Sequence, residues 1–184
     1  FPGSAPLLGA KLGLEGVPCL DIRQQCAATL FGLQMANGLV KTGAARTILF
    51  VGAEAHAGFM PWSSWDALDP ESGKVASDEE RARNNAHRAL AVLFGDGAGA
   101  LVLRATDRPG AGILGMKIFS DGRYSKSLYV PGGGFRARPY WNETMFAEQA
   151  HVPRMEGKEL FKFAVTKLPQ AARALCEETG TPME

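Results

Sequence analysis

The sequence predicts an α/β fold with a parallel sheet, and three features of residues 17–52 lead to this prediction. Residues 17–22 have the length and alternating character of a strand, and residues 27–42 carry apolar side chains over a wide helical arc. Residues 47–52 form a continuous apolar run, which is typical of a central strand covered on both faces. Strand, helix and strand at this spacing predict a βαβ crossover and therefore parallel strands.

The glycines around these elements mark where they end. Residues 1–14 contain one short helical pattern, which Gly13 and Gly16 close. Gly43 follows the helix predicted at 27–42, where we expect it to form a left-handed cap. Small residues inside that helix, Gly32 among them, predict a close approach to a neighbouring backbone.

Residues 54–87 lack a clear periodicity, and a segment of this length is usually functional or mobile. Its acidic part, residues 78–81, is expected to form a short exposed helix. Further on, Gly95-Asp96-Gly97-Ala98-Gly99 lies between two apolar runs. Its spacing is not that of a dinucleotide-binding loop or a P-loop, and it precedes a strand. We expect these glycines to let backbone pack against backbone near a site.

The last third of the chain contains one more predicted strand, a long loop and a long helix. The strand is predicted at 113–119, and a loop with three consecutive glycines follows at 121–141. Residues 158–178 have the pattern of an amphipathic helix, which Pro169 is expected to kink.

Composition and charge exclude several classes of protein. The net charge of +1 implies no nucleic-acid partner. The sequence contains no run of 18 apolar residues, so no membrane span is predicted. The densest basic group, Arg136 and Arg138 beside Tyr140 and Trp141, is interpreted as a solvated loop rather than a phosphate site.

Three cysteines, Cys19, Cys26 and Cys176, are too far apart to indicate a disulfide framework or a zinc site. They predict reduced thiols in a cytoplasmic protein, an expectation that agrees with the lack of a secretory signal. Cys19 is interpreted as core filling and Cys176 as structural. The chain starts without Met and stops directly after a helix, so we expect a piece of a longer protein.

Cys26 is the candidate nucleophile, because it lies where the strand at 17–22 gives way to the helix at 27–42. The first turn of a helix presents unpaired N–H groups and the positive end of the helix dipole. Both favour the thiolate, which is the reactive form of cysteine. From this chemistry alone, a catalytic nucleophile and a small buried hydrophobic residue remain two open interpretations.

Few other residues suggest catalytic chemistry. Asp21 is expected to anchor the end of the strand by hydrogen bonds rather than to react, and Glu54 is considered as a group that could reach the site. The three histidines, His56, His87 and His151, are interpreted as surface or structural residues. A Gly-x-Ser-x-Gly elbow is absent from the sequence, so serine hydrolase chemistry is unsupported.

Three stretches taken together resemble the thiolase superfamily in its ketoacyl synthase III branch. They are residues 16–22 leading to Cys26-Ala27, residues 94–100, and residues 155–161. The resemblance implies a layered α/β/α/β/α fold of two similar halves, of which this chain is a fragment. Residues 1–106 would be the C-terminal part of the first half, with the nucleophile. Residues 107–184 would start the second half and include an inserted loop.

Further stretches resemble the head-to-head acyl-CoA condensing enzymes of long-chain olefin biosynthesis. They are Gln24-Gln25, residues 52–62 and residues 129–135. This resemblance implies that Cys26 accepts an acyl group from a fatty acyl-CoA. A second acyl-CoA would then condense without decarboxylation to a 2-alkyl-3-ketoacyl product. No resident cofactor is implied, because the coenzyme A thioesters are substrates.

The resemblance also implies roles and partners. The backbone N–H of Cys26 would help to hold the tetrahedral oxyanion. The strand at 17–22 would pair with its twofold mate in a homodimer, and a glutamate of the partner subunit would serve as base. A histidine and an asparagine would come from the remaining part of the same enzyme, so we expect the present chain alone to be inactive.

Two alternatives remain open. One is a ketoacyl synthase III-type condensation that uses a malonyl thioester and releases carbon dioxide. The other is a non-catalytic partner subunit of a heterodimeric condensing enzyme, against which the presence of Cys26 argues.

Overall fold

The computed structural model describes residues 3–60, 65–135 and 137–183 of the chain. The chain divides into two compact units. The first unit consists of residues 1–52 and 99–118, and the second of residues 53–98 and 119–184. The resemblance predicts two halves of the complete fold, with a boundary between residues 106 and 107. These halves are not the two compact units, and they stay a prediction.

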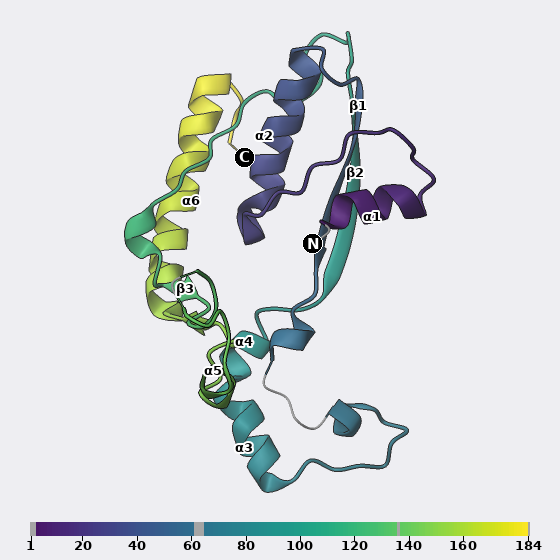
Figure 1. Ribbon diagram of the computed structural model, residues 1–184. Coiled ribbons are helices and arrows are strands. Elements are labelled where there is room, and N and C mark those ends of the chain that lie inside the picture. The colour runs from purple at the N-terminus through teal and green to yellow at the C-terminus, as the bar shows by residue number, and fades with distance from the viewer. Residues whose placement is uncertain (1–2, 61–64, 136, 184) are drawn as a thin grey trace. The chain divides into compact units, whose positions relative to one another are not determined.

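The first unit contains most of the predicted helices and strands of residues 1–52 (Figure 1). Helix α1 spans Ser4–Lys11, a 3-10 turn spans Gln25–Ala27, and helix α2 spans Ala28–Lys41. Strand β1 spans Thr47–Glu54 and pairs with β2, Gly97–Arg104. The predictions of a helix in residues 1–14, a helix at 27–42 and a strand at 47–52 are confirmed, as is the left-handed cap at Gly43, whose φ is 76°.

Strands β1 and β2 run antiparallel. The amide of Ala105, which follows β2, donates to the carbonyl of Arg46, which precedes β1, at 2.9 Å. The end of one strand therefore lies beside the start of the other. The parallel arrangement predicted for residues 17–22 and 47–52 is not found among the described residues, because residues 17–22 form no strand there. Periodicity identifies a strand but not the distant residues to which it is hydrogen-bonded.

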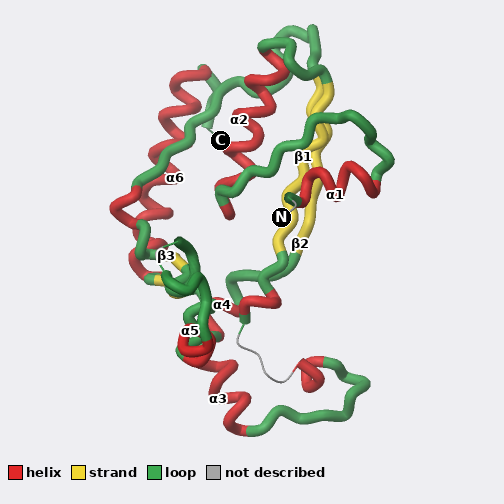
Figure 2. Tube along the Cα trace, in the orientation of Figure 1, coloured by secondary structure: helices red, strands yellow, loops and turns green. Residues whose placement is uncertain are grey.

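Two predicted strands, at 17–22 and 113–119, are wrong. Both segments are loop in the described structure (Figure 2). A strand exists only as part of a hydrogen-bonded ladder, and neither segment has a ladder partner among the described residues. The expected pairing of residues 17–22 with a second copy stays a prediction.

Helix α2 packs on β1 through a glycine, but Gly32 meets a side chain and not the neighbouring backbone that the small residues of the helix predicted. A Cβ atom added to Gly32 would lie 2.9 Å from Cζ of Phe50, so the ring occupies the place of a side chain. The other expectation for β1, cover on both faces, is wrong: Leu49 is 43% and Val51 37% exposed. The described residues of this unit cover only the side of β1 on which Phe50 packs against α2.

Asp21 fixes the loop before Cys26 to the start of α1. Its Oδ1 accepts a hydrogen bond from the amide of Ala5 at 3.0 Å, and its carboxylate lies against Gly3, where a Cβ atom would clash. The anchoring role expected for Asp21 is confirmed, although the element that it anchors is a helix start and not a strand end. This bond supplies the cap that α1 lacks at Gly3.

The second unit is built from short elements and one long helix. Its helices are α3 (Asp78–Ala86), α4 (Arg88–Ala91), α5 (Glu143–Ala147) and α6 (Gly157–Thr179), with short 3-10 turns at Ala57–Phe59, Trp65–Leu68 and Gly122–Tyr124. Strands β3 (Leu128–Tyr129) and β4 (Arg154–Met155) pair antiparallel. The predicted helices at 78–81 and 158–178 are confirmed. The kink expected at Pro169, which lies inside α6, stays a prediction.

The buried centre of the second unit is small. It consists of Met60, Leu90 and Val152, against which Ala91, Phe94 and Met155 pack. These residues come from segments that are far apart in the sequence, so the cluster joins the loop after β1 to α4 and to the chain around β4. None of the helices within the described residues combines the length and the hydropathy of a membrane span.

Candidate active site

Cys26 lies in the 3-10 turn that leads directly into α2, and it is exposed to solvent. The predicted position at the mouth of a helix is therefore found, although an irregular loop and not a strand leads into it. The alternative that Cys26 is a small buried hydrophobic residue does not agree with its exposure. A thiol in this position can be reached by a reagent from solvent.

The amide of Cys26 is not used by the helix. The first helical donors are Ala27, whose amide bonds to the carbonyl of Gln24 at 3.1 Å, and Ala28, whose amide bonds to the carbonyl of Gln25. Within the part of the chain that the structure describes, the Cys26 N–H donates to no acceptor. It can therefore donate to an oxygen atom that develops negative charge beside the sulfur.

The residue before Cys26 has an unusual backbone conformation. Gln25 has a φ of 45°, in the left-handed region that side chains other than glycine rarely adopt. Sequence reasoning missed this feature, because glutamine has no preference for that region and Gly, Asn or Asp would have been the signal.

The side chains of Glu54 and His56 contact each other at the end of β1. Glu54 Oε2 lies 3.2 Å from His56 Nε2, and the His56 ring stacks on Phe94 with 5.0 Å between the ring centroids. Asp96 joins this group by accepting a hydrogen bond from the amide of Ala57 at 2.8 Å. Residues 54–96 belong to the second unit and Cys26 to the first, so the idea that Glu54 acts at Cys26 stays a prediction.

The glycines of the 95–99 segment do not support a close backbone contact. A Cβ atom added to Gly95, Gly97 or Gly99 would meet no atom of the described structure within 4 Å. The expectation of backbone packed against backbone is therefore not met among the described residues. Asp96 is the residue of this segment that makes a defined contact.

The remaining histidines hold the second unit together. His87 Nε2 lies 3.1 Å from Oε1 of Gln149, a part-buried contact that ties α3 and α4 to the chain after α5. His151 packs against the ring of Phe146, with 5.6 Å between the centroids. Both contacts agree with the structural role expected from the sequence.

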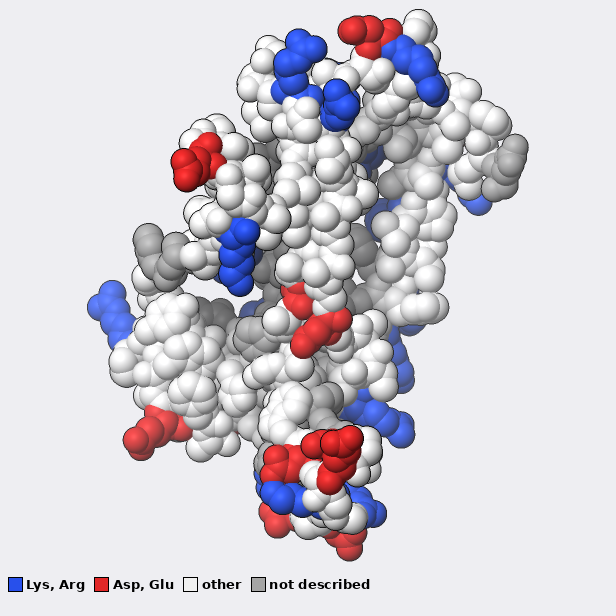
Figure 3. Space-filling view, turned by 90° about the vertical axis from the view of Figure 1, so that its right-hand side faces the viewer, with Lys and Arg blue, Asp and Glu red and all other residues white. Residues whose placement is uncertain are grey.

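The basic and aromatic loop also makes structural contacts. Trp141 stacks on Phe146 and lies against Gly132, where an added Cβ atom would be 2.7 Å from Cζ3 of the indole. Tyr140 contacts the ring of Phe135, and Arg136 lies outside the described residues. In Figure 3, lysine and arginine side chains are scattered over the visible face and interspersed with acidic ones, and the described residues form no basic patch on this face.

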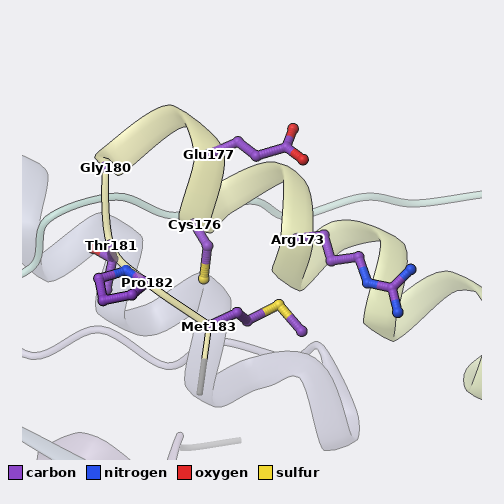
Figure 4. A pocket seen from close by; sticks show the side chains of 7 residues that line it. All are labelled: Arg173, Cys176, Glu177, Gly180, Thr181, Pro182 and Met183. Carbon is purple, nitrogen blue, oxygen red and sulfur yellow. The ribbon is translucent and has the colours of Figure 1, made fainter.

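The other two cysteines have different surroundings. Cys19 is exposed, so the interpretation as core filling is wrong; it contacts Gly9, and the loop around it has no covering layer among the described residues. Cys176 points from the last turns of α6 toward Met183 and lines a shallow cavity of about 390 Å³ (Figure 4).

A second cavity, of about 160 Å³, lies between the loop before β3 and the start of α6. It is lined by Asp121, Ser127 and Glu159 together with the rings of Phe119, Tyr124 and Phe163. Neither this cavity nor the one at Cys176 includes Cys26. In the described residues, no group of three His, Cys, Asp or Glu side chains is placed to hold a metal ion.

Solved structures of synthases share this fold. The 3-oxoacyl-(acyl carrier protein) synthase III of Pseudomonas aeruginosa PAO1 superposes with a TM-score of 0.72 at 28% identity, covering 97% of this chain and 46% of that chain. The synthase III of Thermus thermophilus superposes with a TM-score of 0.71 at 30% identity, covering 98% and 46%. The chain therefore has part of the thiolase-like α/β fold of these condensing enzymes.

Sequence comparison leads to the family. The profile of 3-oxoacyl-[acyl-carrier-protein (ACP)] synthase III matches residues 20–69 and 75–122, which include Cys26. The chain belongs to this family.

Curated relatives agree with this assignment. The beta-ketoacyl-[acyl-carrier-protein] synthase III of Neisseria gonorrhoeae (strain NCCP11945) is 34% identical over 189 residues, covering 100% of this chain and 48% of the relative. That of Cereibacter sphaeroides (strain ATCC 17029 / ATH 2.4.9) is 33% identical over 184 residues, covering 98% and 46%. The chain spans about half the length of the curated relatives it matches.

Proposed function

We propose that Cys26 carries an acyl group during a carbon–carbon condensation between two thioesters. The observation that carries the proposal is the turn at Cys26, where an exposed thiol is followed by a helix start and accompanied by an unused amide. Family membership supports it, because the matched segment 20–69 contains this turn.

In the first step, the Cys26 thiolate attacks the carbonyl carbon of an acyl thioester. The carbonyl oxygen becomes an oxyanion, which the Cys26 N–H stabilises; one such donor is commonly worth about 3 kcal/mol in the transition state. The tetrahedral intermediate then expels the thiolate of the carrier, and the acyl group remains on the sulfur of Cys26. The released thiolate takes up a proton and becomes the free thiol of the carrier.

In the second step, a carbon nucleophile attacks the acyl group on Cys26. We favour a malonyl thioester as its source, because the curated relatives are named beta-ketoacyl-[acyl-carrier-protein] synthase III. Loss of carbon dioxide from the malonyl group leaves an enolate, which forms the new carbon–carbon bond. The Cys26 thiolate is the leaving group, and the product is a 3-oxoacyl thioester.

A second candidate is the head-to-head condensation of two fatty acyl-CoA molecules. Gln24-Gln25, residues 52–62 and residues 129–135 favour it through their resemblance to the olefin-pathway enzymes. In that reaction, a base removes a proton from the α-carbon of the second acyl-CoA and no carbon dioxide is lost. The similarity to curated synthase III relatives favours the decarboxylative route over this one.

Either reaction needs groups that the resemblance assigns outside residues 1–184. A histidine, an asparagine and a base from a partner subunit would complete the site, so we propose a homodimer and expect no turnover by this chain alone. The partners would be acyl thioesters, a second copy and the remaining part of the same enzyme. No resident cofactor is required by either route.

The first step can be tested on the chain itself by incubation with a fatty acyl-CoA and mass spectrometry of its peptides. We expect slow acylation at Cys26 in preference to Cys19 and Cys176, which serve as internal references in the same sample. Equal labelling of the three thiols would contradict the proposal. Unchanged activity of an assembled enzyme with Cys26→Ala would support a non-catalytic partner subunit instead.

The second step can be tested in a chimera, in which this chain replaces the matching part of the Neisseria gonorrhoeae synthase. Labelled carbon dioxide released from malonyl thioester would support the decarboxylative route. A 2-alkyl-3-ketoacyl product from two acyl-CoA molecules, without carbon dioxide, would support the head-to-head route. A folded chimera that gives neither product, while the parent synthase remains active in the same assay, would contradict both.

A further inference from the structure

The cavity between the loop before β3 and the start of α6 has a lining that the proposed condensation does not use. Its volume is about 160 Å³, far above the roughly 15 Å³ that one water molecule needs. All the residues that line it belong to the second unit. The cavity can therefore admit a small organic molecule without any contribution from the first unit.

Aromatic rings make up much of this lining. The rings of Tyr124 and Phe163 contact each other, with 4.9 Å between their centroids and an angle of 51° between their planes. Phe119 and Leu160 add further apolar surface. The faces of aromatic rings carry partial negative charge and attract cations, and quaternary ammonium groups are the ligands that such rings typically recognise. The rings alone would also accept an uncharged apolar group, so the charges of the remaining lining decide the class of ligand.

Two carboxylates line the cavity, and they have different partners. Asp121 accepts hydrogen bonds from the side chain of Arg123, the shortest at 2.6 Å, and the charge of Lys167 also acts on it. Glu159 has a neutral partner, the hydroxyl of Ser127, which donates to Oε2 at 2.6 Å. Among the described residues, Glu159 forms no ion pair, and the neighbouring lysines on α6 do not line the cavity. Its negative charge is therefore left for a ligand to balance.

The lining is held in place by hydrogen bonds of the chain itself. Ser127 is only 4% exposed, its amide donates to the carbonyl of Tyr124 at 2.9 Å, and its carbonyl accepts from the amide of Glu156 at 2.8 Å. These bonds connect the loop before β3 to the residue that precedes α6. A site that is formed before the ligand arrives avoids part of the entropy cost of binding.

We propose that this cavity binds a small quaternary ammonium ion, whose cationic group lies on the rings of Tyr124 and Phe163 and is balanced by the carboxylate of Glu159. Binding involves no covalent step. The proposal goes beyond the proposed function and does not depend on it, because Cys26 does not line the cavity. Failure of acyl transfer at Cys26 would leave the ammonium site untouched, and the converse also holds.

The experiment titrates the chain with choline and, separately, with 3,3-dimethylbutan-1-ol, in which a carbon atom replaces the charged nitrogen. Broadening of the methyl proton signals of each probe in NMR spectra gives its dissociation constant. We expect choline to bind at least about tenfold more tightly than the alcohol, because only choline balances the charge of Glu159. Binding of the two probes with equal affinity, or no binding of choline, would overturn the proposal.

Two variants test the assigned residues. Glu159→Gln removes the charge but keeps an acceptor for the hydroxyl of Ser127, and it should weaken choline binding about tenfold. Phe163→Leu removes one ring and should weaken choline binding about fivefold. Unchanged affinity in either variant, once circular dichroism shows that it is folded, would overturn the proposal. If one variant does not fold, the other still decides.

Glu79 offers a matched control on α3, because its side chain is 86% exposed and already pairs with Arg83. Glu79→Gln removes the same charge from the same unit and should leave the affinity for choline unchanged. An equal loss in Glu79→Gln and Glu159→Gln would reduce the effect to net charge and overturn the site. Choline should also bind the chimera described above. Binding to the chain that disappears in the folded chimera would show that the remaining part of the enzyme fills the cavity, which contradicts the proposal.

Discussion

Helices α2 and α3 start in opposite ways. At the start of α3, Oγ of Ser77 accepts a hydrogen bond from the amide of Glu80 at 3.2 Å, and Oε2 of Glu80 accepts one from the amide of Ser77 at 2.8 Å. Acidic residues fill the first turn of α3. At the start of α2, neither Gln24 nor Ala27 provides a side-chain cap, and the first turn holds no acidic residue.

The difference shows what each helix start is for. Capping and acidic residues stabilise a helix by satisfying its free amides and its positive end, as they do at Ser77. The start of α2 lacks this stabilisation, and the residue that occupies its turn is Cys26. Helices α4 and α6 also begin without a side-chain cap, so the lack of a cap does not by itself mark the candidate site. The start of α2 differs from the capped start of α3 in leaving its first amides free beside a thiol.

The largest effect is expected from Cys26→Ala. Removal of the sulfur should abolish acyl transfer to this turn completely, while the fold and the labelling of Cys19 and Cys176 stay as in the parent. Peptide mass spectrometry after incubation with acyl-CoA measures this. An acyl adduct that still forms at the parent's rate on another residue of Cys26→Ala would contradict the assignment of acyl transfer to the start of α2.

The next effect is expected at the capped helix. Ser77→Ala removes one of the two reciprocal bonds and should lower the free energy of unfolding by about 1 kcal/mol. Because the capping box lies in the second unit, the alkylation rate of Cys26 should not change. Urea denaturation and thiol labelling on the same sample check both statements, and a change in Cys26 labelling would show that the two helix starts are not independent.

A smaller effect is expected when α2 is given a cap. In Gln24→Ser, the serine hydroxyl can accept a bond from the amide of Cys26 or Ala27, which should stabilise the helix and occupy its free end. We expect Cys26 to alkylate about threefold more slowly and the urea midpoint to rise. Gln24→Ala, which offers no acceptor, is the control. Faster labelling of Gln24→Ser than of Gln24→Ala would contradict the comparison.

The smallest effect is expected at a third turn, where a carboxylate does the capping. Oδ1 of Asp121 accepts a hydrogen bond from the amide of Arg123 at 3.1 Å, and the Arg123 side chain also donates to this carboxylate. The side-chain hydrogen bond from Arg123, followed by the backbone one, lowers the pKa of Asp121 from 3.8 to about 2.

A carboxyl group whose pKa is lower in the folded state stabilises the fold above its unfolded pKa, and this stabilisation disappears as the pH falls through the folded pKa. Asp121→Asn should therefore unfold at a slightly lower urea concentration than the parent at pH 5, and the difference should shrink between about pH 4 and pH 2. Urea titrations across this range measure it. A difference between Asp121→Asn and the parent that grows toward acid pH would contradict the assignment. The side chain of Ser77 does not titrate, so the difference between Ser77→Ala and the parent should show no such trend.

Local signals in the sequence predicted helices α1, α2, α3 and α6 and the candidate nucleophile, but not the short helices α4 and α5. The apolar period of α2, the acidic run at 78–81 and the position of Gly43 are each decided within a few residues, so the sequence contains them directly. Strand pairing is decided between distant residues. The sequence accordingly identified β1 but not the antiparallel direction of β2, and it predicted a strand at 113–119 where no ladder partner is found among the described residues.

The candidate site divides in the same way. Cys26 could be predicted, because its place before a helical pattern is a local property. The left-handed Gln25 could not, because the surrounding fold imposes a conformation that the residue type does not prefer. The bond from Ala5 to Asp21 lies between these cases: the sequence suggested an anchor, and the structure identifies α1 as the element that it anchors.

The contact between Gly32 and Phe50 limits how this part of the molecule can vary. Because the ring of Phe50 fills the space that a side chain at position 32 would need, the two positions share one volume. A larger side chain at either position alone would push α2 away from β1 and displace the turn that contains Cys26. Homologues should therefore exchange size between these two positions in compensating pairs, so that a bulkier residue at 32 accompanies a slimmer one at 50.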